Sequence, residues 1–249
     1  MIKPILHDLS QIEEKPVLYS EAHWIDIFRQ KGAWWQHDGN PKRPHALLTN
    51  GDHSDGFFNC GLVLEDALVV EEISRDLVGK LCLKGYKNNV YSEKPHYVVG
   101  PAMGAIVLAY AVALELQRTW IPSLVDNPFV WRSVFTEKEE PSEMVFKRIV
   151  PPRGSVALPI EDTITTSKSV GKTISACEQA GMEVLPYVLA VLNRSDLMTV
   201  GQGNGQIVAL VTKRMNNWSP AECPLCKKGS KALRPKTPAS NWDLLTATY

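Results

Sequence analysis

The chain lacks the features that mark several classes of protein. It has no apolar run long enough to cross a bilayer, so we expect no membrane span and no membrane partner. Lys plus Arg and Asp plus Glu both number 27, and this zero net charge gives no support for nucleic-acid binding. The first residues lack the apolar region of a secretory signal peptide. The five cysteines form no disulfide framework, so we expect a reduced, cytoplasmic protein.

The chain does contain apolar strand patterns that alternate with helical patterns. The expected strands are 97–100, 133–135, 144–146, 156–160, 184–192 and 207–211, and the expected helices follow Ser20 or cover 66–84, about 105–117 and 168–180. This alternation predicts an α/β fold with a mostly parallel central sheet and helices on both faces. We assign residues 1–215 to one domain, with an N-terminal hood segment (a helix and a loop) in 1–60. Residues 216–249, rich in Pro, Lys and Ser, are expected to form an irregular C-terminal tail.

The strongest functional signal is the run from Val156 to Ser169. An apolar strand leads into two adjacent carboxylates, Glu161 and Asp162, and then into a turn dense with hydroxyls. Carboxylates accept hydrogen bonds from neighbouring hydroxyls such as those of a ribose. Hydroxyls and the free N–H groups at a helix start bind phosphate. One ligand that contains a ribose and a phosphate would satisfy both parts of the run, although Ser and Thr at a helix start also serve as simple caps.

The same run resembles the signature of type I phosphoribosyltransferases, which bind 5-phosphoribosyl-1-diphosphate (PRPP). The resemblance implies that Glu161 and Asp162 hold the ribose and that the turn holds the 5-phosphate. The PRPP residues of this run are Glu161, Asp162, Thr163, Thr165, Thr166, Ser167, Lys168 and Ser169. Where the family usually has two glycines, this chain has Ser167 and Lys168. A positive φ there would cost an L-residue about 1–2 kcal/mol. Two placements of Lys168 stay open: beside the phosphate, where its charge would offset this cost, or projecting into solvent.

A second segment narrows the resemblance to orotate phosphoribosyltransferases. The run from His45 to Asn59 resembles their base-covering loop, and it carries Thr49 and the aromatic pair Phe57 and Phe58. The resemblance implies that these residues bind orotate together with Thr165 and Arg194. Arg194 follows an expected strand, and its planar guanidinium suits the orotate carboxylate.

A third segment, Val98 to Ala109, resembles the family's pyrophosphate loop. The resemblance assigns Met103, Gly104 and Ala105 to the diphosphate of PRPP. Small residues let the backbone approach an anion, and a helix start lies behind them. Ala105 stands where a second glycine is usual, which removes easy access to a positive φ.

A fourth segment, Val134 to Glu139, resembles the entry to the family's mobile catalytic loop. The resemblance implies a homodimer in which loop 137–143 lies over the partner's active site and Lys138 reaches the diphosphate. Glu137 stands where some members carry Arg.

Together these resemblances imply Mg²⁺-dependent transfer of ribose 5-phosphate from PRPP to orotate. The resemblance assigns catalytic roles to Lys138, Asp162 and Glu161. Mg²⁺ is expected to be held mainly by PRPP oxygens and waters rather than by protein ligands. Carboxylates beside the ribose suit the positive charge that develops on its ring. Two alternatives stay open: a phosphoribosyltransferase for another base, and a regulator that senses PRPP without catalysis.

The tail contains the motif Cys223-Pro224-Leu225-Cys226. Such a pair can supply half of a zinc site, but a second CxxC pair is absent from the sequence. His45 and His53 are expected near the active site, with no sign that they approach the tail. A structural turn with reduced thiols and a metal or redox site therefore both remain open for the cysteine pair.

Overall fold

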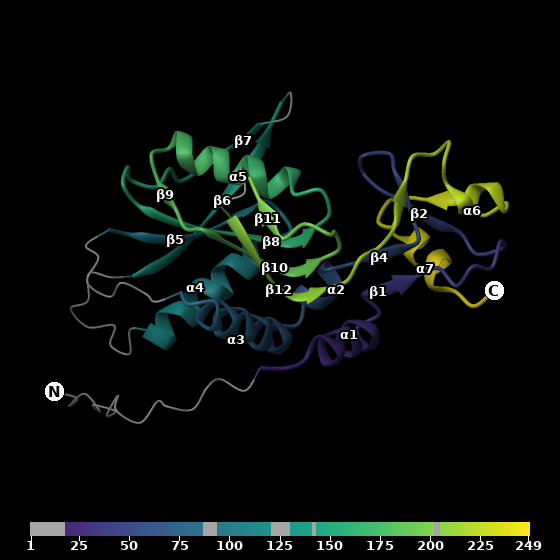
Figure 1. The fold of residues 1–249 in the computed structure, drawn as a ribbon, viewed down its shortest axis with the longest axis horizontal. Coiled ribbons are helices and arrows are strands. Elements are labelled where there is room, and N and C mark those ends of the chain that lie inside the picture. The colour runs from purple at the N-terminus through teal and green to yellow at the C-terminus, as the bar shows by residue number, and fades with distance from the viewer. Residues whose placement is uncertain (1–17, 87–93, 121–129, 141–142, 202–204) are drawn as a thin grey trace.

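An eight-stranded sheet forms the centre of the computed structural model, which describes residues 18–86, 94–120, 130–140, 143–201 and 205–249. Its strands are β5 (His96–Pro101), β6 (Trp131–Glu139), β7 (Glu143–Val145), β8 (Val156–Ile164), β9 (Glu183–Val184), β10 (Tyr187–Asn193), β11 (Thr199–Val200) and β12 (Gly205–Thr212). They lie in the order β11-β12-β10-β8-β5-β6-β7, and β9 pairs with β8 off this path (Figure 1). The pairs that run from β12 to β6 are parallel, whereas β11 and β7 pair antiparallel at the two edges.

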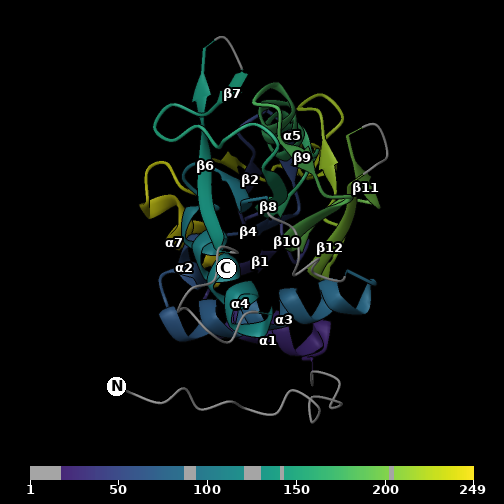
Figure 2. The ribbon, with the colours of Figure 1, turned by 90° about the vertical axis from the view of Figure 1, so that its left-hand side faces the viewer.

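Helices cover both faces of this sheet. The helices α1 (Glu21–Gln30), α3 (Ala67–Leu83) and α4 (Ile106–Trp120) lie on one face, and α5 (Lys168–Gln179) lies on the other (Figures 1 and 2). The largest cluster of core side chains lies under the three-helix face, where Leu77, Leu108 and Leu158 are fully buried. The expected α/β fold with a mostly parallel sheet is confirmed.

Capping residues set the helix boundaries. Ser20 has an extended backbone before α1, and its side-chain oxygen accepts a hydrogen bond from the His23 N–H at 3.2 Å. Asp66 caps α3 in the same way. Gly32, just after α1, has a φ of +64°, which glycine adopts without a Cβ penalty. The helices expected after Ser20 and over 66–84 therefore form where the sequence places them.

A small lobe, which we define as residues 34–60 and 217–249, lies beside the sheet (Figure 1). It contains the strands β1 (Trp34–Gln36), β2 (His45–Leu47), β3 (His53–Ser54), β4 (Gly56–Phe58), β13 (Asn217–Trp218) and β14 (Ala232–Leu233). Four of them form a sheet in the order β13-β3-β2-β14, and β1 pairs antiparallel with β4. The helix α2 (Gly61–Leu64) leads from this lobe to α3.

The tail from residue 216, expected to be irregular, carries short regular elements. Its strand β13 pairs with β3, and β14 pairs in parallel with β2. The helices α6 (Pro224–Lys227) and α7 (Ser240–Thr246) complete it. Elements of 2 to 7 residues are too short to show a hydrophobic period, which is why the tail looks irregular in sequence. The division into a domain 1–215 and an extension 216–249 stays a prediction.

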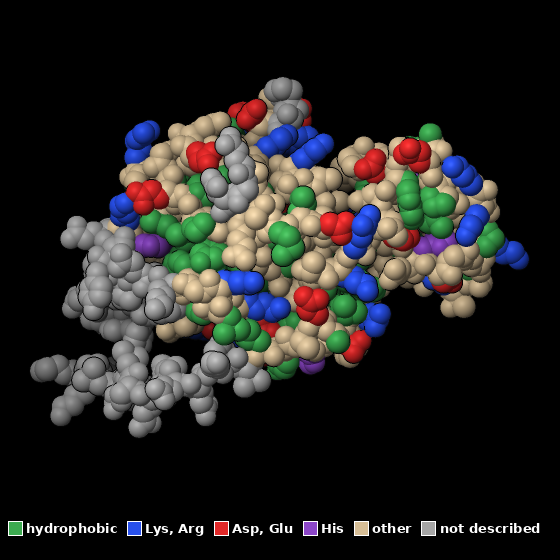
Figure 3. All heavy atoms as spheres, in the orientation of Figure 1, with side chains coloured by type: hydrophobic (Ala, Val, Ile, Leu, Met, Phe, Trp, Pro, Cys, Tyr) green, Lys and Arg blue, Asp and Glu red, His purple; other side chains and the backbone are tan. Residues whose placement is uncertain are grey.

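The surface carries both signs of charge. On the face shown in Figure 3, Lys and Arg side chains are interspersed with Asp and Glu. Of the helices that the structure describes, none combines the length and the apolar composition that crossing a membrane requires. The expectation that nucleic acid is not a partner stays a prediction, to which the mixed charge of this face adds support.

Candidate active site

A cavity of about 400 Å³ lies where the carboxyl end of β8 meets the small lobe. Its lining comes from both sides: Leu48, Thr49, Asn50, Phe57, Phe58 and Lys236 from the small lobe, and Asp162, Thr163, Thr165, Thr166, Lys168, Ser169 and Arg194 from the sheet side. Ligands of parallel α/β sheets bind at the carboxyl ends of strands. A larger cavity of about 530 Å³ lies beside α5 and β9, but its single charged lining residue is Glu178, so it lacks a cation for a phosphate.

Two adjacent carboxylates stand near the end of β8. Glu161 is 7% exposed, and the half-buried Asp162 lines the cavity. The Asp162 N–H donates to Glu161 Oε1 at 3.3 Å, and Asp162 Oδ1 accepts from the Thr163 N–H at 2.6 Å. Burial, reinforced by the neighbouring Asp162 carboxylate, raises the pKa of Glu161 well above its usual range. The pair thus offers oxygen acceptors in a site where negative charge is poorly solvated.

The turn from β8 into α5 presents hydroxyls to the same cavity. Thr165, Thr166 and Ser169 line it, and Lys168 brings a positive charge. Ser167 has a φ of +56°, in the left-handed region that glycine usually occupies. The concern that Ser167 replaces glycine at a position of positive φ is therefore confirmed. The unpaired N–H groups at the start of α5 lie at this end of the helix, where they favour an anion.

The loop after β5 lies against these carboxylates without lining the cavity. A Cβ on Gly104 would lie 2.7 Å from Asp162 Oδ2, so this close approach requires glycine. A Cβ on Gly100 would lie 2.6 Å from the Cβ of Ala105. Ala105 is fully buried, and Ser167 is the one non-glycine residue of positive φ in the described chain. Alanine therefore fits where the resembled motif has a second glycine, while Met103 is exposed beside it.

The side of the cavity that β4 forms is aromatic. Phe57 and Phe58 both line it, close to Thr49. The Phe58 ring also belongs to the core, where its centre lies 4.7 Å from that of Phe28. Phe57 is only partly buried, and Lys236 Nζ lies 5.8 Å from its ring centre. Phe57 is consequently the better placed of the two rings to contact a flat ligand.

Arg194 is a buried cation in the cavity wall. Its side chain is 3% exposed, and Nη2 donates to Ser54 Oγ at 2.7 Å and to Asn217 Oδ1 at 2.9 Å. Its Nε has no hydrogen-bond partner, and the carboxylate whose charge acts on it is that of Asp55. Burial lowers the pKa of Arg194 to about 10, so the group remains charged at neutral pH. A buried cation with an unpaired N–H favours an anionic ligand.

Lys138 lies outside this cavity. Its exposed side chain, near the end of β6, forms an ion pair with Glu140 at 3.5 Å. Glu137, which replaces a cation of the resembled motif, is paired with Arg148 at 2.7 Å. The expected loop at 137–143 is largely the end of the β6–β7 ribbon, since pairing continues to Glu139, and residues 141 and 142 lie outside the described residues.

Lys236 is the charged cavity residue that the sequence reasoning missed. It stands in the Pro- and Lys-rich tail, where neither a motif nor a hydrophobic period marks it. Its place depends on β14, which pairs with β2 across 187 residues of sequence separation, from His45 to Ala232. Leu48 and Asn50 also line the cavity, although the resemblance assigns only Thr49 of that turn to the ligand.

Comparison with known proteins identifies relatives by sequence and by structure. No family model matches the chain. An orotate phosphoribosyltransferase of Heliobacterium modesticaldum is 32% identical over 222 residues, which cover 87% of this chain and 97% of the relative. One of Caldanaerobacter subterraneus is 32% identical over 192 residues, which cover 77% and 87%. The crystal structure of orotate phosphoribosyltransferase from Aeropyrum pernix matches with a TM-score of 0.51 at 20% identity, over 75% of this chain and 92% of that one.

The mostly parallel sheet and the likeness to this solved structure give the chain the fold of a type I phosphoribosyltransferase. The identity to curated relatives over most of both sequences goes further than the fold. On that ground the chain belongs to the orotate phosphoribosyltransferase family.

Proposed function

We propose that the protein transfers the ribosyl 5-phosphate group of PRPP to N1 of orotate, which yields orotidine 5'-monophosphate and pyrophosphate in pyrimidine nucleotide synthesis. The observation that carries the proposal is the buried, incompletely paired Arg194 on the same cavity as Asp162 and the hydroxyl-rich turn. A carboxylate, a ribose and a phosphate are the three ligand groups for which this cavity offers partners.

The sheet side of the cavity takes PRPP. Asp162 and Glu161 accept hydrogen bonds from the ribose hydroxyls, and the turn from Thr165 to Ser169, together with Thr163, holds the 5-phosphate. The backbone at Met103–Ala105 takes the diphosphate. The close approach of Gly104 to Asp162 supports this assignment, because it brings that loop next to a ribose carboxylate.

The reaction itself needs no covalent nucleophile. The bond from ribose C1 to the diphosphate oxygen breaks with its electron pair on the leaving group, and a bond from N1 of orotate forms at C1. Positive charge develops on the ribose ring between these events, and the carboxylates at the end of β8 stabilise it.

The residues present fit a magnesium ion that arrives with PRPP. Mg²⁺ prefers oxygen ligands, keeps several waters and binds through one or two carboxylates plus substrate phosphates. Glu161 and Asp162 are the oxygen donors at this site. A bound ion would neutralise part of the diphosphate charge. The residues of the chain orient the ribose toward the base.

The small-lobe side takes orotate. Phe57 offers its ring to the flat pyrimidine, with Phe58 behind it, and Thr49 and Thr165 stand at the edges of the same space. Arg194 binds the orotate carboxylate. A base without a carboxylate leaves that guanidinium without an anion, which is why we favour orotate over another base.

We further propose that the protein is a cytoplasmic homodimer and that Lys138 acts on the partner's diphosphate. Exposed apolar side chains on α4 support an interface: Val107, Tyr110 and Leu114. The exposed Ile149 lines a cavity together with Val107 and Tyr110, and the exposed Val150 follows it in sequence. The exposure of Lys138 leaves it accessible to a second subunit. Five free cysteines support a reducing compartment.

A phosphate turn without glycine is the main argument for a regulator that lacks catalysis. The structure weakens that argument, because Ser167 adopts the positive φ that glycine would supply. The turn therefore keeps a backbone conformation that glycine would adopt. The Cβ of Ser167 lowers the stability of the fold but leaves this conformation in place.

Loss of orotate absorbance with PRPP and Mg²⁺ tests the proposal. Asp162→Asn should lower kcat at least about 10²-fold, since it removes a charge aimed at the transition state. Arg194→Met should raise the KM for orotate and leave the KM for PRPP near that of the wild type. Arg75→Met, which changes an exposed arginine of α3, is the matched control and should change neither.

The outcomes separate the alternatives. Turnover of another base but not of orotate would overturn the assignment of the substrate. PRPP binding by calorimetry without turnover of any base would point to a regulator. Mixing Asp162→Asn with Lys138→Ala tests the shared site, because a mixed dimer regains one intact site if Lys138 acts across the interface.

A further inference from the structure

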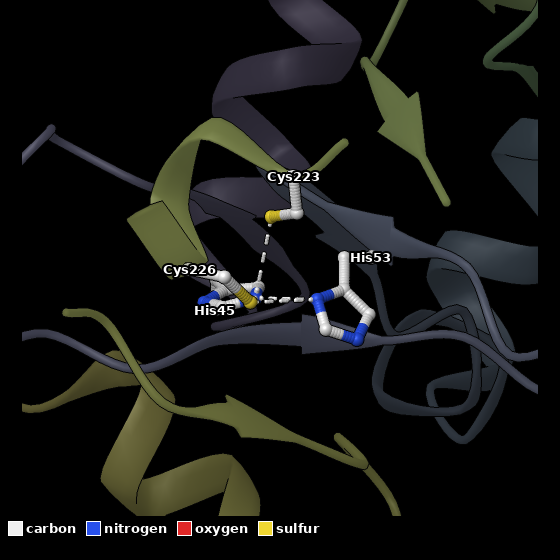
Figure 4. A group of neighbouring side chains, drawn as sticks. All are labelled: His45, His53, Cys223 and Cys226. Carbon is white, nitrogen blue, oxygen red and sulfur yellow. Dashed lines mark hydrogen bonds between the residues drawn. The ribbon is translucent and has the colours of Figure 1, made fainter. Parts of the chain in front are cut away.

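Four potential metal ligands converge in the small lobe, away from the cavity described above. His45 lies on β2, His53 on β3, Cys223 just before α6, and Cys226 within it. Their ligand atoms all lie within 4.8 Å of one another. Figure 4 shows the side chains pointing toward one another from the β2–β3 hairpin and from the segment around α6.

The separations centre on one nitrogen atom. His45 Nε2 lies 2.9 Å from His53 Nδ1, 3.5 Å from Cys226 Sγ and 3.6 Å from Cys223 Sγ. His53 Nδ1 lies 3.2 Å from Cys226 Sγ. A tetrahedral Zn²⁺ with bonds of about 2.3 Å to sulfur and 2.0–2.1 Å to nitrogen sets sulfur and nitrogen ligands about 3.5–3.6 Å apart. Of these four separations, the two from His45 Nε2 to sulfur already match that value, and the two that involve His53 Nδ1 need an opening of only a few tenths of an ångström.

A neighbouring hydroxyl sets the protonation of the central histidine. Ser230 Oγ donates its proton to the Arg43 carbonyl oxygen at 2.6 Å. It therefore accepts from Nδ1–H of His45, which lies 2.8 Å away. Nε2 of the neutral ring is then unprotonated, and its lone pair faces His53, Cys223 and Cys226. Metal-bound histidines are oriented by a hydrogen bond of this kind to the second ring nitrogen.

We propose that His45, His53, Cys223 and Cys226 bind one Zn²⁺ as a closed structural site. Two thiolates and two imidazoles suit zinc and do not suit Mg²⁺ or Ca²⁺, which prefer oxygen. Four protein ligands leave no open position for substrate, which is the pattern of structural rather than catalytic zinc. The proposal is independent of the proposed transferase activity.

The small lobe has a physical need for such a site. Its own buried apolar cluster consists of Trp35, Ala46 and Leu245, which is a small core for two chain segments. Zinc binding contributes folding free energy directly where a core is insufficient. Because two ligands come from each segment, the ion joins the hairpin to the tail.

The site also bears on the geometry of the cavity. His45 and His53 flank the turn that brings Leu48, Thr49 and Asn50 to the cavity, and Ser54, next to His53, accepts a hydrogen bond from Arg194. The tail beyond Cys226 carries Lys236 to the same cavity. The zinc ligands thus act as positioning residues for the small-lobe half of the cavity.

The first test measures metal in the untagged full-length protein after exhaustive dialysis against metal-free buffer. Mass spectrometry of the elements should find about one zinc per chain in the wild type. The controls Cys82→Ser and His23→Ala, which change the same residue types outside the cluster, should retain it. The double variant Cys223→Ser/Cys226→Ser should lose it.

A second measurement needs no variant and so does not depend on whether a variant folds. X-ray absorption at the zinc edge of the wild type should fit two sulfur ligands near 2.3 Å and two nitrogen ligands near 2.0–2.1 Å. Wild-type protein that neither carries zinc nor takes it up from added zinc chloride would overturn the proposal. So would a first shell without sulfur, or a double cysteine variant that is folded and keeps its zinc.

Discussion

The central sheet and the small lobe are held together by different means. Strands β8 and β10 are almost wholly buried, and side chains such as Ile160 and Leu189 are inaccessible to solvent. The small lobe has a much smaller buried apolar cluster of its own, and its two chain segments meet through strand pairs between residues 45–54 and 217–233 and at the His–Cys cluster. The comparison teaches that a hydrophobic pattern specifies the first region, whereas long-range polar contacts specify the second.

Function uses both regions because the cavity lies between them. The sheet side supplies carboxylates on a strand and hydroxyls at a helix start, which are held rigidly. The small lobe supplies Phe57 and Lys236 from segments with few buried neighbours. The geometry of the cavity therefore depends on how the small lobe is held against the sheet.

The largest expected effect comes from matched leucine truncations in the two regions. Leu158→Ala leaves a cavity in the main core and should lower the free energy of global unfolding by about 2–5 kcal/mol. Leu245→Ala removes one of the three members of the small lobe's core, so we expect faster hydrogen exchange in residues 34–60 and 217–249 and a smaller global loss. Urea unfolding and hydrogen exchange by mass spectrometry measure both. Equal global losses for the two variants would show that the lobe and the sheet unfold as one unit.

The second prediction concerns Glu161 and the stability of the sheet side. The folded pKa of Glu161 is raised above the unfolded value of 4.5, so the unfolded state releases the proton first as pH rises. Wild-type stability contributed by this group is therefore present below that pH and is lost as pH rises toward the folded pKa. Glu161→Gln should be more stable than the wild type at neutral pH, and the difference should disappear in acid.

Urea unfolding at both pH values checks this sign, with the exposed Glu178→Gln of α5 as the control. A Glu161→Gln protein less stable than the wild type at neutral pH would mean that the ionised carboxylate is stabilised in the fold. The same variant should also lose transferase activity, so stability and activity would move in opposite directions at one residue.

The smallest expected effect is at the phosphate turn. Ser167→Gly removes the Cβ penalty at a φ of +56° and should stabilise the protein by about 1 kcal/mol, partly offset by the greater freedom of glycine when unfolded. Ser175→Gly, inside α5, is the matched control and should destabilise by about 0.5–1 kcal/mol. Thermal unfolding measures both. Destabilisation by Ser167→Gly as well would mean that the serine side chain contributes more than its backbone strain costs.

Much of the sheet region could be predicted from the sequence because its signals are local. The strand at 156–160 and the helices over 66–84 and 168–180 carry apolar periods and caps within a few residues. The cluster of Asp162, Thr165 and Ser169 could be predicted for the same reason, since all of it belongs to one strand–turn–helix unit.

The small lobe could not be predicted because its contacts join distant parts of the chain. Nothing within the sequence around His45 indicates that Cys223 lies 3.6 Å from it, nor does the tail indicate that Lys236 reaches the cavity. Strands of two residues, such as β13 and β14, form only when β3 and β2 are already in place to pair with them. Information of this kind is absent from any short window of sequence.

Because the small lobe pairs residues 45–54 with residues 217–233, it cannot assemble before residues 217–233 have left the ribosome. Domains generally form in order of synthesis, and the sheet up to β12 is complete before the tail emerges. The nascent hairpin therefore spends most of translation without its partner strands. The two sides of the cavity are therefore completed at different times during synthesis: residues 162–169 and 194 can fold with the sheet, whereas Lys236 joins the cavity only after the tail has paired with the hairpin.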